Sequence, residues 1–280
     1  MNASRNLGDA GFYAQTYDAS VPDWPGEIDF YRELGAETRS RGERLLEIGC
    51  GTGRVAIRLA REGIGTVGLD LSLHMLEVAR EKSKDLANIR WVHADMRDFD
   101  LGVTFGLVII PGHAFQCLNT PEEQAACMRC IYRHLNPAGR VVIHLDHQDF
   151  RWLGGLVGEK GGVFEPAEQF EHPVTRQQIR ASRAWTYEPS TQTATCVTAW
   201  EAVAADGQVI DRWEREPVRL HCVFRFEMEH LLARAGFHVA DVYGDFFRSP
   251  LEDDSSNMIW VAHKSETGEQ AYDRWPAPGI

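Results

Sequence analysis

Hydrophobic and polar positions follow two different rhythms along this chain of 280 residues. In the first half, short apolar runs alternate with longer segments whose apolar residues recur at helical spacing, which is typical of buried strands alternating with helices. Such βαβ units place helices on both faces of a parallel sheet, so the pattern predicts an α/β fold with a doubly wound sheet. The expected strands are 44–49, 63–71, 89–95, 105–111 and 140–146, and the expected helices between them are Arg54–Arg61, His74–Lys84 and Pro121–Leu135.

The rhythm changes after residue 150, where apolar and polar residues alternate one by one. Three such runs, 176–188, 193–204 and 208–224, predict a small inserted antiparallel sheet, and Asp206-Gly207 between the last two runs is a strong hairpin signal. A helix at Glu227–Ala235 and strands at 236–246 and 255–264 complete the first pattern. The predicted domains are an N-terminal cap segment at 1–40 with a helix from Pro25, a cofactor domain made of 41–150 and 226–264, the inserted sheet at 151–225, and a tail at 265–280.

The charge balance narrows the classes of partner. Lys and Arg number 29 against 41 Asp and Glu, which gives a net charge of −12, and no run of basic residues occurs. Nucleic acids and anionic membrane surfaces are bound through basic surfaces, so we expect neither as a partner. The apolar runs are far shorter than the roughly 20 residues of a membrane span, and the first residues lack the apolar core of a signal peptide, so the sequence predicts a cytoplasmic protein.

The six cysteines do not have the spacing of a disulfide framework. Cys127 and Cys130 form a CxxC pair within a segment that is expected to be helical. A structural zinc site needs a second pair at similar spacing, and a redox pair is expected where a strand meets a helix. We interpret both cysteines as small apolar residues that face the core.

The stretch from Glu47 to Arg54 (EIGCGTGR) carries the most chemical information. Glycines placed where the first strand meets its helix permit positive φ and a close approach of the backbone to a ligand. A dinucleotide-binding loop would have its third glycine at position 54, where this chain has arginine, and this disfavours a dehydrogenase. The Glu47 carboxylate instead suits a cationic ligand group.

Acidic residues also follow the next two strands. Asp70 can accept hydrogen bonds from ribose hydroxyls, Asp95 can accept one from the exocyclic amine of adenine, and Met96 can pack on the ring. Three acids at successive strand ends point to one ligand-binding edge of the sheet. The chain closely resembles the class I S-adenosylmethionine-dependent methyltransferases of small molecules from about Arg44 to Asp146, and again at AGFHVADVYGDF. The segments that carry this resemblance are, in order, LLEIGCGTGRVAIRLA, GTVGLDLSLHMLEVAR, WVHADMRDF, LVIIPGHAFQCL and IYRHLNPAGRVVIHL.

The resemblance implies a seven-stranded, mostly parallel sheet whose last strand is antiparallel, with S-adenosylmethionine as the cofactor. By motif position, Glu47, Gly49 and Gly51 would line the methionine part. Asp70 and Leu71 would line the ribose and adenine, and Asp95 and Met96 the adenine. Tyr13 and Tyr17 stand where related enzymes carry a tyrosine that closes over the cofactor, although aromatic residues near a terminus also serve as packing residues. The full expected cofactor set adds Cys50, Gly53, Met75 and Pro111.

The methyl acceptor is expected above the fourth and fifth strands. His113 is the first candidate for a base or a substrate hydrogen-bonder, because histidine titrates near neutrality; a loop histidine satisfied by backbone is the alternative. Similar enzymes often read AFxHL where this chain has AFQCL, with Cys117 in place of the histidine. His147 is a second catalytic candidate. The segment HLDHQD has the composition of a metal-ligand cluster, but on a strand His144 and Asp146 share one face and His147 points to the other, so metal binding is disfavoured. The expected substrate-binding residues are His113, Phe115, Gln116, His144, Asp146 and His147.

The aromatic residues of the insert, such as Trp200 and Trp213, fit three interpretations: a lid over an apolar substrate, the packed face of a sheet, or a contact in a homodimer. We predict a methyltransferase that acts on nitrogen or oxygen of a small organic molecule such as a natural-product intermediate. The alternatives are a nucleic-acid or ribosomal methyltransferase and a non-catalytic binding protein with the same fold. The residues do not identify the acceptor.

Overall fold

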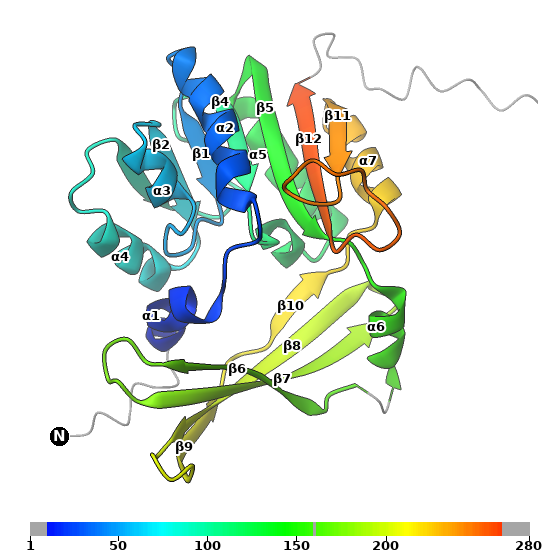
Figure 1. Ribbon diagram of the computed structural model, residues 1–280. Helices are drawn as coiled ribbons and strands as arrows, with labels where there is room; N and C mark the ends of the chain where they lie inside the picture. Colours follow the sequence, from blue (N-terminus) through cyan, green and yellow to red (C-terminus); the bar gives the residue numbers. More distant parts are fainter. Residues whose placement is uncertain (1–9, 159–160, 265–280) are drawn as a thin grey trace, which may run out of the picture.

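The computed structural model describes residues 10–158 and 161–264 (Figure 1). The predicted tail at 265–280 lies outside this range. The described chain forms a large sheet flanked by helices and a smaller antiparallel sheet that lies below it in Figure 1.

The large sheet has seven strands in the order β11-β12-β5-β4-β1-β2-β3. β12 is antiparallel to both β5 and β11, and the strands from β5 to β3 are parallel to one another. The predicted α/β fold with an antiparallel last strand is therefore confirmed. The strands are β1 (Leu45–Ile48), β2 (Thr66–Asp70), β3 (Ile89–His93), β4 (Phe105–Ile110), β5 (Leu135–Asp146), β11 (Phe237–Tyr243) and β12 (Asn257–Lys264).

Alternation along the central strands divides the core between the two faces of this sheet. Leu45 packs in a cluster with Phe30 and Tyr31, whereas its neighbour Leu46 packs with Met128 on the other face. Successive side chains of a strand point to opposite faces, so one apolar run supplies both halves of the core. The helices are α2 (Glu27–Ser40) and α3 (Ala56–Arg61) on the first face, α5 (Pro121–His134) and α7 (Arg225–Arg234) on the second, and α4 (Leu73–Lys82) beside β2 and β3.

The predicted inserted sheet is present, with two differences from the expected strands. The run 208–224 is split into β9 and β10, which lie one after the other along the same edge of β8, and the strand β6 was not predicted. Pro217 lies between β9 and β10, where the missing N–H of proline interrupts a ladder. The strands are β6 (Phe164–Glu171), β7 (Gln178–Glu188), β8 (Thr193–Val203), β9 (Val209–Glu214) and β10 (Val218–His221).

The predicted cap segment holds two helices with different neighbours. α2 packs against the large sheet, whereas α1 (Ala10–Ser20) lies between the two sheets (Figure 1). The Phe12 ring is 5.3 Å from Trp200 and 4.9 Å from Trp213, centroid to centroid, so α1 is packed on the small sheet. The short helix α6 (Phe150–Gly155) follows β5, which begins at Leu135 because residues 136–139, expected as a loop, continue that strand.

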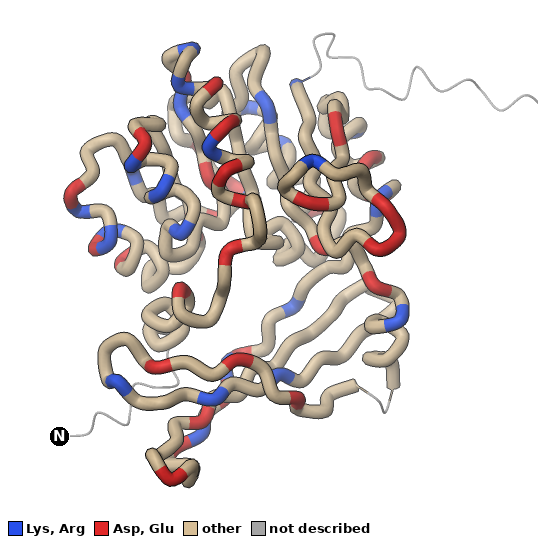
Figure 2. The backbone as a smooth tube through the Cα atoms, in the orientation of Figure 1, with Lys and Arg blue, Asp and Glu red and all other residues tan. Residues whose placement is uncertain are grey.

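Figure 2 shows acidic and basic residues interspersed along the chain in both sheets. In the ranges that the structure describes, none of the helices combines the length and the apolar character that crossing a membrane requires.

Candidate active site

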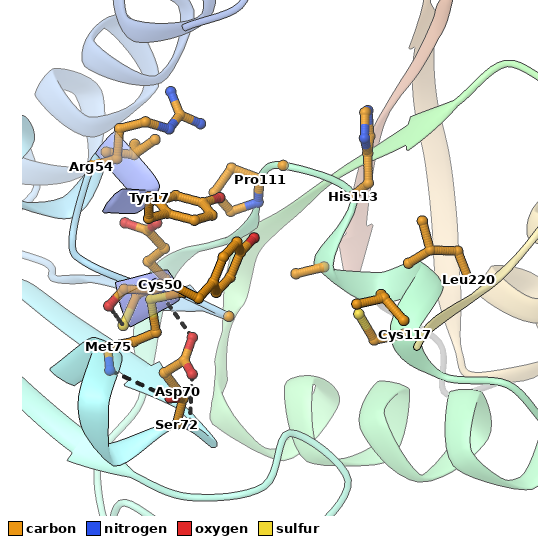
Figure 3. A pocket seen from close by; sticks show the side chains of 18 of the residues that line it. Tyr17, Cys50, Arg54, Asp70, Ser72, Met75, Pro111, His113, Cys117 and Leu220 are labelled. Carbon is orange, nitrogen blue, oxygen red and sulfur yellow. Dashed lines mark hydrogen bonds between the residues drawn. The ribbon is translucent and has the colours of Figure 1, made fainter. Parts of the chain in front are cut away.

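A cavity of about 600 Å³ is lined by residues from the large-sheet domain, from the small sheet and from α1. Its walls come from the glycine loop after β1, the end of β2, the loop after β4, and the small sheet. In Figure 3, Tyr17, Cys50, Asp70 and Met75 line one end, and His113, Cys117 and Leu220 line the other. Of the predicted cofactor residues, Tyr13, Tyr17, Glu47, Gly49, Cys50, Gly51, Asp70, Met75 and Pro111 line this cavity.

The three glycines of the loop differ in what surrounds them. Gly49, Gly51 and Gly53 all have positive φ, at 69°, 54° and 78°. A Cβ atom at Gly49 would come within 2.5 Å of the Ala114 Cβ atom, and one at Gly53 within 2.5 Å of the Trp91 ring. At Gly51 a Cβ atom would have no atom of the described residues within 4 Å, and this glycine lines the cavity. Gly49 and Gly53 are thus required by packing, and Gly51 leaves space that a ligand can occupy.

Backbone hydrogen bonds fix the Asp70 carboxylate at the end of β2. The Gly51 N–H donates to Oδ2 at 2.7 Å, and the Ser72 N–H donates to Oδ1 at 2.8 Å (Figure 3). Burial raises the pKa of this carboxyl, and the two backbone donors oppose the shift. Each carboxylate oxygen has a second lone pair, so Asp70 can still accept hydrogen bonds from ligand hydroxyls.

Glu47 is a buried acid without enough partners. Its side chain lines the cavity and is almost wholly buried, and Oε2 has no hydrogen-bond partner in the described part of the chain. Burial raises the pKa of Glu47 to about 8, with Arg54 opposing the shift. An orphaned buried carboxylate is costly unless a cation or a donor completes it, so the residues present fit a positively charged ligand group at this end.

Arg54 ties the glycine loop to α2. Its guanidinium donates to both carboxylate oxygens of Glu27, at 2.5 and 2.9 Å, and to Asp23 Oδ1 at 2.7 Å. Glu27 is fully buried, so this bidentate pair is shielded from solvent. Arg54, which stands where a dinucleotide-binding loop would have its third glycine, therefore anchors the glycine loop to α2.

α1 covers the cofactor end of the cavity. The rings of Tyr13 and Tyr17 meet edge to face at 5.5 Å, and both line the cavity. The Thr52 hydroxyl donates to Asp18 Oδ1 at 2.6 Å, which links α1 to the glycine loop. Burial raises the pKa of both tyrosines, so they remain neutral hydrogen-bond donors at physiological pH.

His113 stands at the other end, in the loop after β4. It adopts φ 62°, a left-handed conformation that is uncommon outside glycine, and it lines the cavity. Its Nε2 atom is 3.0 Å from His144 Nε2. Burial lowers the pKa of His113 to about 4, so the ring is neutral at pH 7 and can take part in hydrogen bonds as a neutral imidazole.

The other predicted substrate residues do not line this cavity. His144 is fully buried behind His113, with Nε2 2.8 Å from Asn257 Oδ1, and burial lowers its pKa to about 3. Asp146 Oδ1 is 3.3 Å from His113 Nε2. His147 Nδ1 lies 2.8 Å from the Ser255 carbonyl oxygen. Phe115 and Gln116 are buried, and the Gln116 side-chain oxygen accepts from the Asp146 N–H at 2.9 Å.

Within residues 10–158 and 161–264 no group of His, Cys, Asp and Glu is arranged to hold a metal ion.

Four predicted cofactor residues also lie outside the cavity wall. Gly53 is buried behind the loop, and Leu71 is 63% exposed. Asp95 is paired with Arg97, whose Nη2 atom is 2.6 Å from Oδ2. Met96 packs against the main core. Contacts of these residues with an adenine ring stay predictions.

Several wall residues were not predicted. Ser72 caps α4 by accepting from the Met75 N–H at 3.3 Å, a role that its place before a helical run could have indicated. Trp200 agrees with the interpretation of the insert as a lid, whereas the other small-sheet residues of the wall had no comparable short-range signal. The wall residues outside the predicted set are Arg54, Val55, Ser72, Gly112, Ala114, Cys117, Trp200, Arg215, Glu216, Val218 and Leu220.

Known proteins share this sequence pattern and this fold. Residues 45–139 match the family described as "Methyltransferase domain". The chain is 25% identical over 256 residues to "Putative methyltransferase YqeM" of Bacillus subtilis (strain 168), covering 91% of this chain and 97% of that protein. It is 33% identical over 135 residues to the dTDP-3-amino-3,4,6-trideoxy-alpha-D-glucopyranose N,N-dimethyltransferase of Streptomyces venezuelae, a match that spans 48% of this chain and 55% of that protein.

Among solved structures, the CcbJ methyltransferase of Streptomyces caelestis superposes with a TM-score of 0.74 at 24% identity, covering 92% of this chain and 98% of that chain. This likeness extends over the large sheet and the small sheet together, because it covers nearly the whole of both chains. The fold expected from the sequence is confirmed.

Proposed function

This chain carries a class I methyltransferase domain, and from that premise we propose that it transfers a methyl group from S-adenosylmethionine to nitrogen or oxygen of a small organic molecule. The observation that carries the proposal is a single cavity that runs from the orphaned Glu47 carboxylate to the neutral His113 ring. One partly open cavity thus offers a place for a cationic cofactor beside a place for an acceptor.

The residues present fit S-adenosylmethionine at the first end. Glu47 would hold its positively charged methionine part, the open space at Gly51 would admit it, and Asp70 would accept from the ribose hydroxyls. When bound, this cofactor supplies a methyl group already activated by the sulfonium charge. Tyr13 and Tyr17 would exclude water from this end, since α1 covers it.

The remaining work of the chain is to position the acceptor and to receive its proton. His113 is neutral at pH 7 because its pKa is lowered to about 4, so it can accept a hydrogen bond from an acceptor N–H or O–H. Apolar side chains of the small sheet, including Trp200, Val218 and Leu220, form the facing wall. This gives the inserted sheet the role of a lid over the acceptor.

A small acceptor is supported by the charge and by the relatives. The chain has a net charge of −12, and the acidic and basic residues are interspersed (Figure 2), which disfavours a nucleic-acid or ribosomal acceptor. The relative from Streptomyces venezuelae is named for dimethylation of a nucleotide-linked amino sugar, and this favours nitrogen over oxygen. A non-catalytic binding protein is disfavoured because the cofactor end and the acceptor end share one cavity.

The cysteines support a cytoplasmic location. Six cysteines are free, and five of them are buried, as is usual in a reducing compartment. A homodimer would place exposed aromatic residues of α6, Phe150 and Trp152, in a contact between chains. Sedimentation of the purified chain at several concentrations tests this association.

Calorimetric titration separates the classes of function. We expect S-adenosylmethionine to bind and NADH not to bind; absence of binding by S-adenosylmethionine would reject the proposal. His113→Ala should slow methyl transfer while it leaves the cofactor affinity within about twofold of the wild type. Unchanged transfer in this variant would remove His113 from the role of proton acceptor.

A further inference from the structure

Among residues 10–158 and 161–264, one arginine of the cavity wall has no carboxylate partner. Arg215 lies between β9 and β10, and it lines the cavity together with Trp200 and Leu220. Resting on the function proposed above, we propose that Arg215 binds a carboxylate or phosphate group of the methyl acceptor. The acceptor would then be an anionic small molecule, or a zwitterionic one if the methylated group is an amine.

Arg215 meets Tyr13 through the face of its guanidinium and through a side-chain hydrogen bond, which leaves its other N–H groups available. The guanidinium carbon lies 3.6 Å from the centroid of the Tyr13 ring, which is a stacked cation–π arrangement. Stacking uses the flat face of the guanidinium, so N–H groups at its edge can still meet a carboxylate or phosphate in the bidentate manner that arginine favours. The Arg215 backbone N–H donates to the Thr198 carbonyl at 2.9 Å, which anchors the residue to β8.

Three other arginines of the small sheet are paired with acids, whereas Arg219 of β10 is exposed to solvent and lies outside the cavity wall. Arg180 pairs with Glu201 at 2.6 Å, and Arg183 pairs with Glu168 at 2.6 Å. Arg212, three residues before Arg215, pairs with Glu214 at 3.4 Å and with Glu201 at 3.6 Å. For Arg215, no salt bridge with Asp or Glu is formed among residues 10–158 and 161–264, although Glu216 is its neighbour and also lines the cavity.

The position favours the acceptor over the cofactor as the source of the anion. Arg54, the other arginine of the cavity wall, lies at the glycine loop and is already neutralised by Glu27 and Asp23. Arg215 comes instead from the sheet that supplies the apolar wall opposite the main domain. A positive charge among apolar side chains, in a chain of net charge −12, gives the cavity a local preference for an anion.

Binding of small probe anions tests the proposal. The protein is first saturated with S-adenosylhomocysteine and then titrated with benzoate, phenyl phosphate or benzyl alcohol, whose rings suit the apolar wall. We expect at least one of the two anions to bind more tightly than the alcohol. Arg215→Gln should weaken that anion at least about tenfold and leave the alcohol unchanged, and Arg215→Lys should lie between, because it keeps the charge and loses the fork.

Arg212→Gln is the matched control, since Arg212 is exposed, paired and outside the cavity wall; its affinities should equal those of the wild type. The proposal is overturned if neither anion binds more tightly than benzyl alcohol, or if Arg215→Gln leaves anion binding unchanged. A loss of S-adenosylhomocysteine affinity in Arg215→Gln also overturns it, because the guanidinium would then serve the cofactor carboxylate. Failure of the wild-type protein to bind the cofactor rejects the proposed function itself, so the two failures are distinguishable.

Discussion

The imidazole rings of His113 and His144 meet nitrogen to nitrogen, with their Nε2 atoms 3.0 Å apart. One nitrogen must donate and the other accept, so the contact requires that at least one ring be neutral. Trp24 covers both rings, at 5.0 Å from each centroid to centroid. Burial accordingly lowers the pKa of His113 to about 4 and that of His144 to about 3. The surroundings of the pair thus favour the neutral form of both histidines.

This pair predicts a loss of stability in acid. Both pKa values are lower in the folded chain than the value of about 6.5 expected when unfolded, so the unfolded state binds more protons below that pH. The stabilisation is present above pH 6.5 and is lost as the pH falls toward 4, by up to about 1.4 kcal/mol per pH unit for each ring. Asp146, which faces His113, has a pKa raised by burial and opposes part of this trend.

Urea denaturation at pH 7 and pH 5 measures the effect. The difference in unfolding free energy between the two pH values should be smaller in His113→Gln than in the wild type. It should be unchanged in His238→Gln, whose side chain is exposed. Equal differences in the wild type and in His113→Gln would contradict the assignment of neutral rings.

The glycine loop predicts that two alanine substitutions act differently. Gly51→Ala adds a Cβ atom where nothing lies within 4 Å, so the cost to stability is the left-handed conformation alone, about 1–2 kcal/mol. Gly49→Ala has the same conformational cost and also brings its Cβ atom within 2.5 Å of the Ala114 side chain. Gly49→Ala should therefore lower the melting temperature more than Gly51→Ala.

A larger side chain at Gly51 should affect cofactor binding separately from stability. Gly51→Arg should abolish binding of S-adenosylmethionine, because the side chain fills the open space, while its melting temperature stays near that of Gly51→Ala. Calorimetry on the folded variants provides the measurement. Full cofactor affinity in Gly51→Arg would show that the space at Gly51 is not the cofactor site.

The raised pKa of Glu47 predicts that cofactor binding releases a proton. Its pKa is raised to about 8 in the ligand-free chain, so at pH 7 the carboxyl is mostly protonated. A positively charged ligand group beside the orphaned Oε2 atom stabilises the carboxylate and lowers that pKa. Calorimetric titration at pH 7 in two buffers of different ionisation enthalpy should show more proton release in the wild type than in Glu47→Gln. The same release in both proteins would contradict the role of Glu47.

How far the sequence predicts the fold depends on where the hydrophobic pattern is strong. The runs that became β1 and β4 are buried along their whole length, and their apolar character alone identified them. β6 was missed because most of its residues are exposed, so Phe164–Glu171 lacks a buried alternation. The start of β5 at Leu135 was missed because Asn-Pro-Ala-Gly at 136–139 has the composition of a turn. The register against β4 shifts across these residues, from Leu135 opposite Phe105 to Arg140 opposite Leu107.

For the site, the residues that the sequence indicated are those whose role follows from a strand end. Glu47, Gly51 and Asp70 stand where a strand meets a loop, and all three line the cavity. Trp200 and Arg215 lie more than 100 residues away along the chain, and only the docking of the small sheet brings them to the same cavity. His144 is buried against His113, Trp24 and Phe246 and does not line the cavity. Contacts of this kind depend on tertiary packing, which local patterns do not encode.

The buried ion pair between Glu27 and Arg54 anchors the glycine loop. Glu27 accepts two hydrogen bonds from Arg54 and is fully buried, so Glu27→Ala leaves the guanidinium with Asp23 as its remaining carboxylate partner. Breaking one side of a buried ion pair costs about 3–5 kcal/mol, and Asp23 should hold the loss near the lower figure. Glu27→Ala should therefore lower the unfolding free energy by about 3 kcal/mol, measured by urea denaturation at pH 7. Cofactor affinity should fall with it, because the loop loses its tie to α2.

Arg58→Gln is the control for that measurement. Arg58 also pairs with Asp23, but both side chains are exposed, so its loss should cost no more than about 1 kcal/mol. Equal losses for Glu27→Ala and Arg58→Gln would mean that burial adds nothing to the pair, and Arg54 would then be an ordinary surface residue of the loop. A larger loss for Glu27→Ala with unchanged cofactor affinity would keep the pair as a stabilising contact and remove it from the positioning of the cofactor loop.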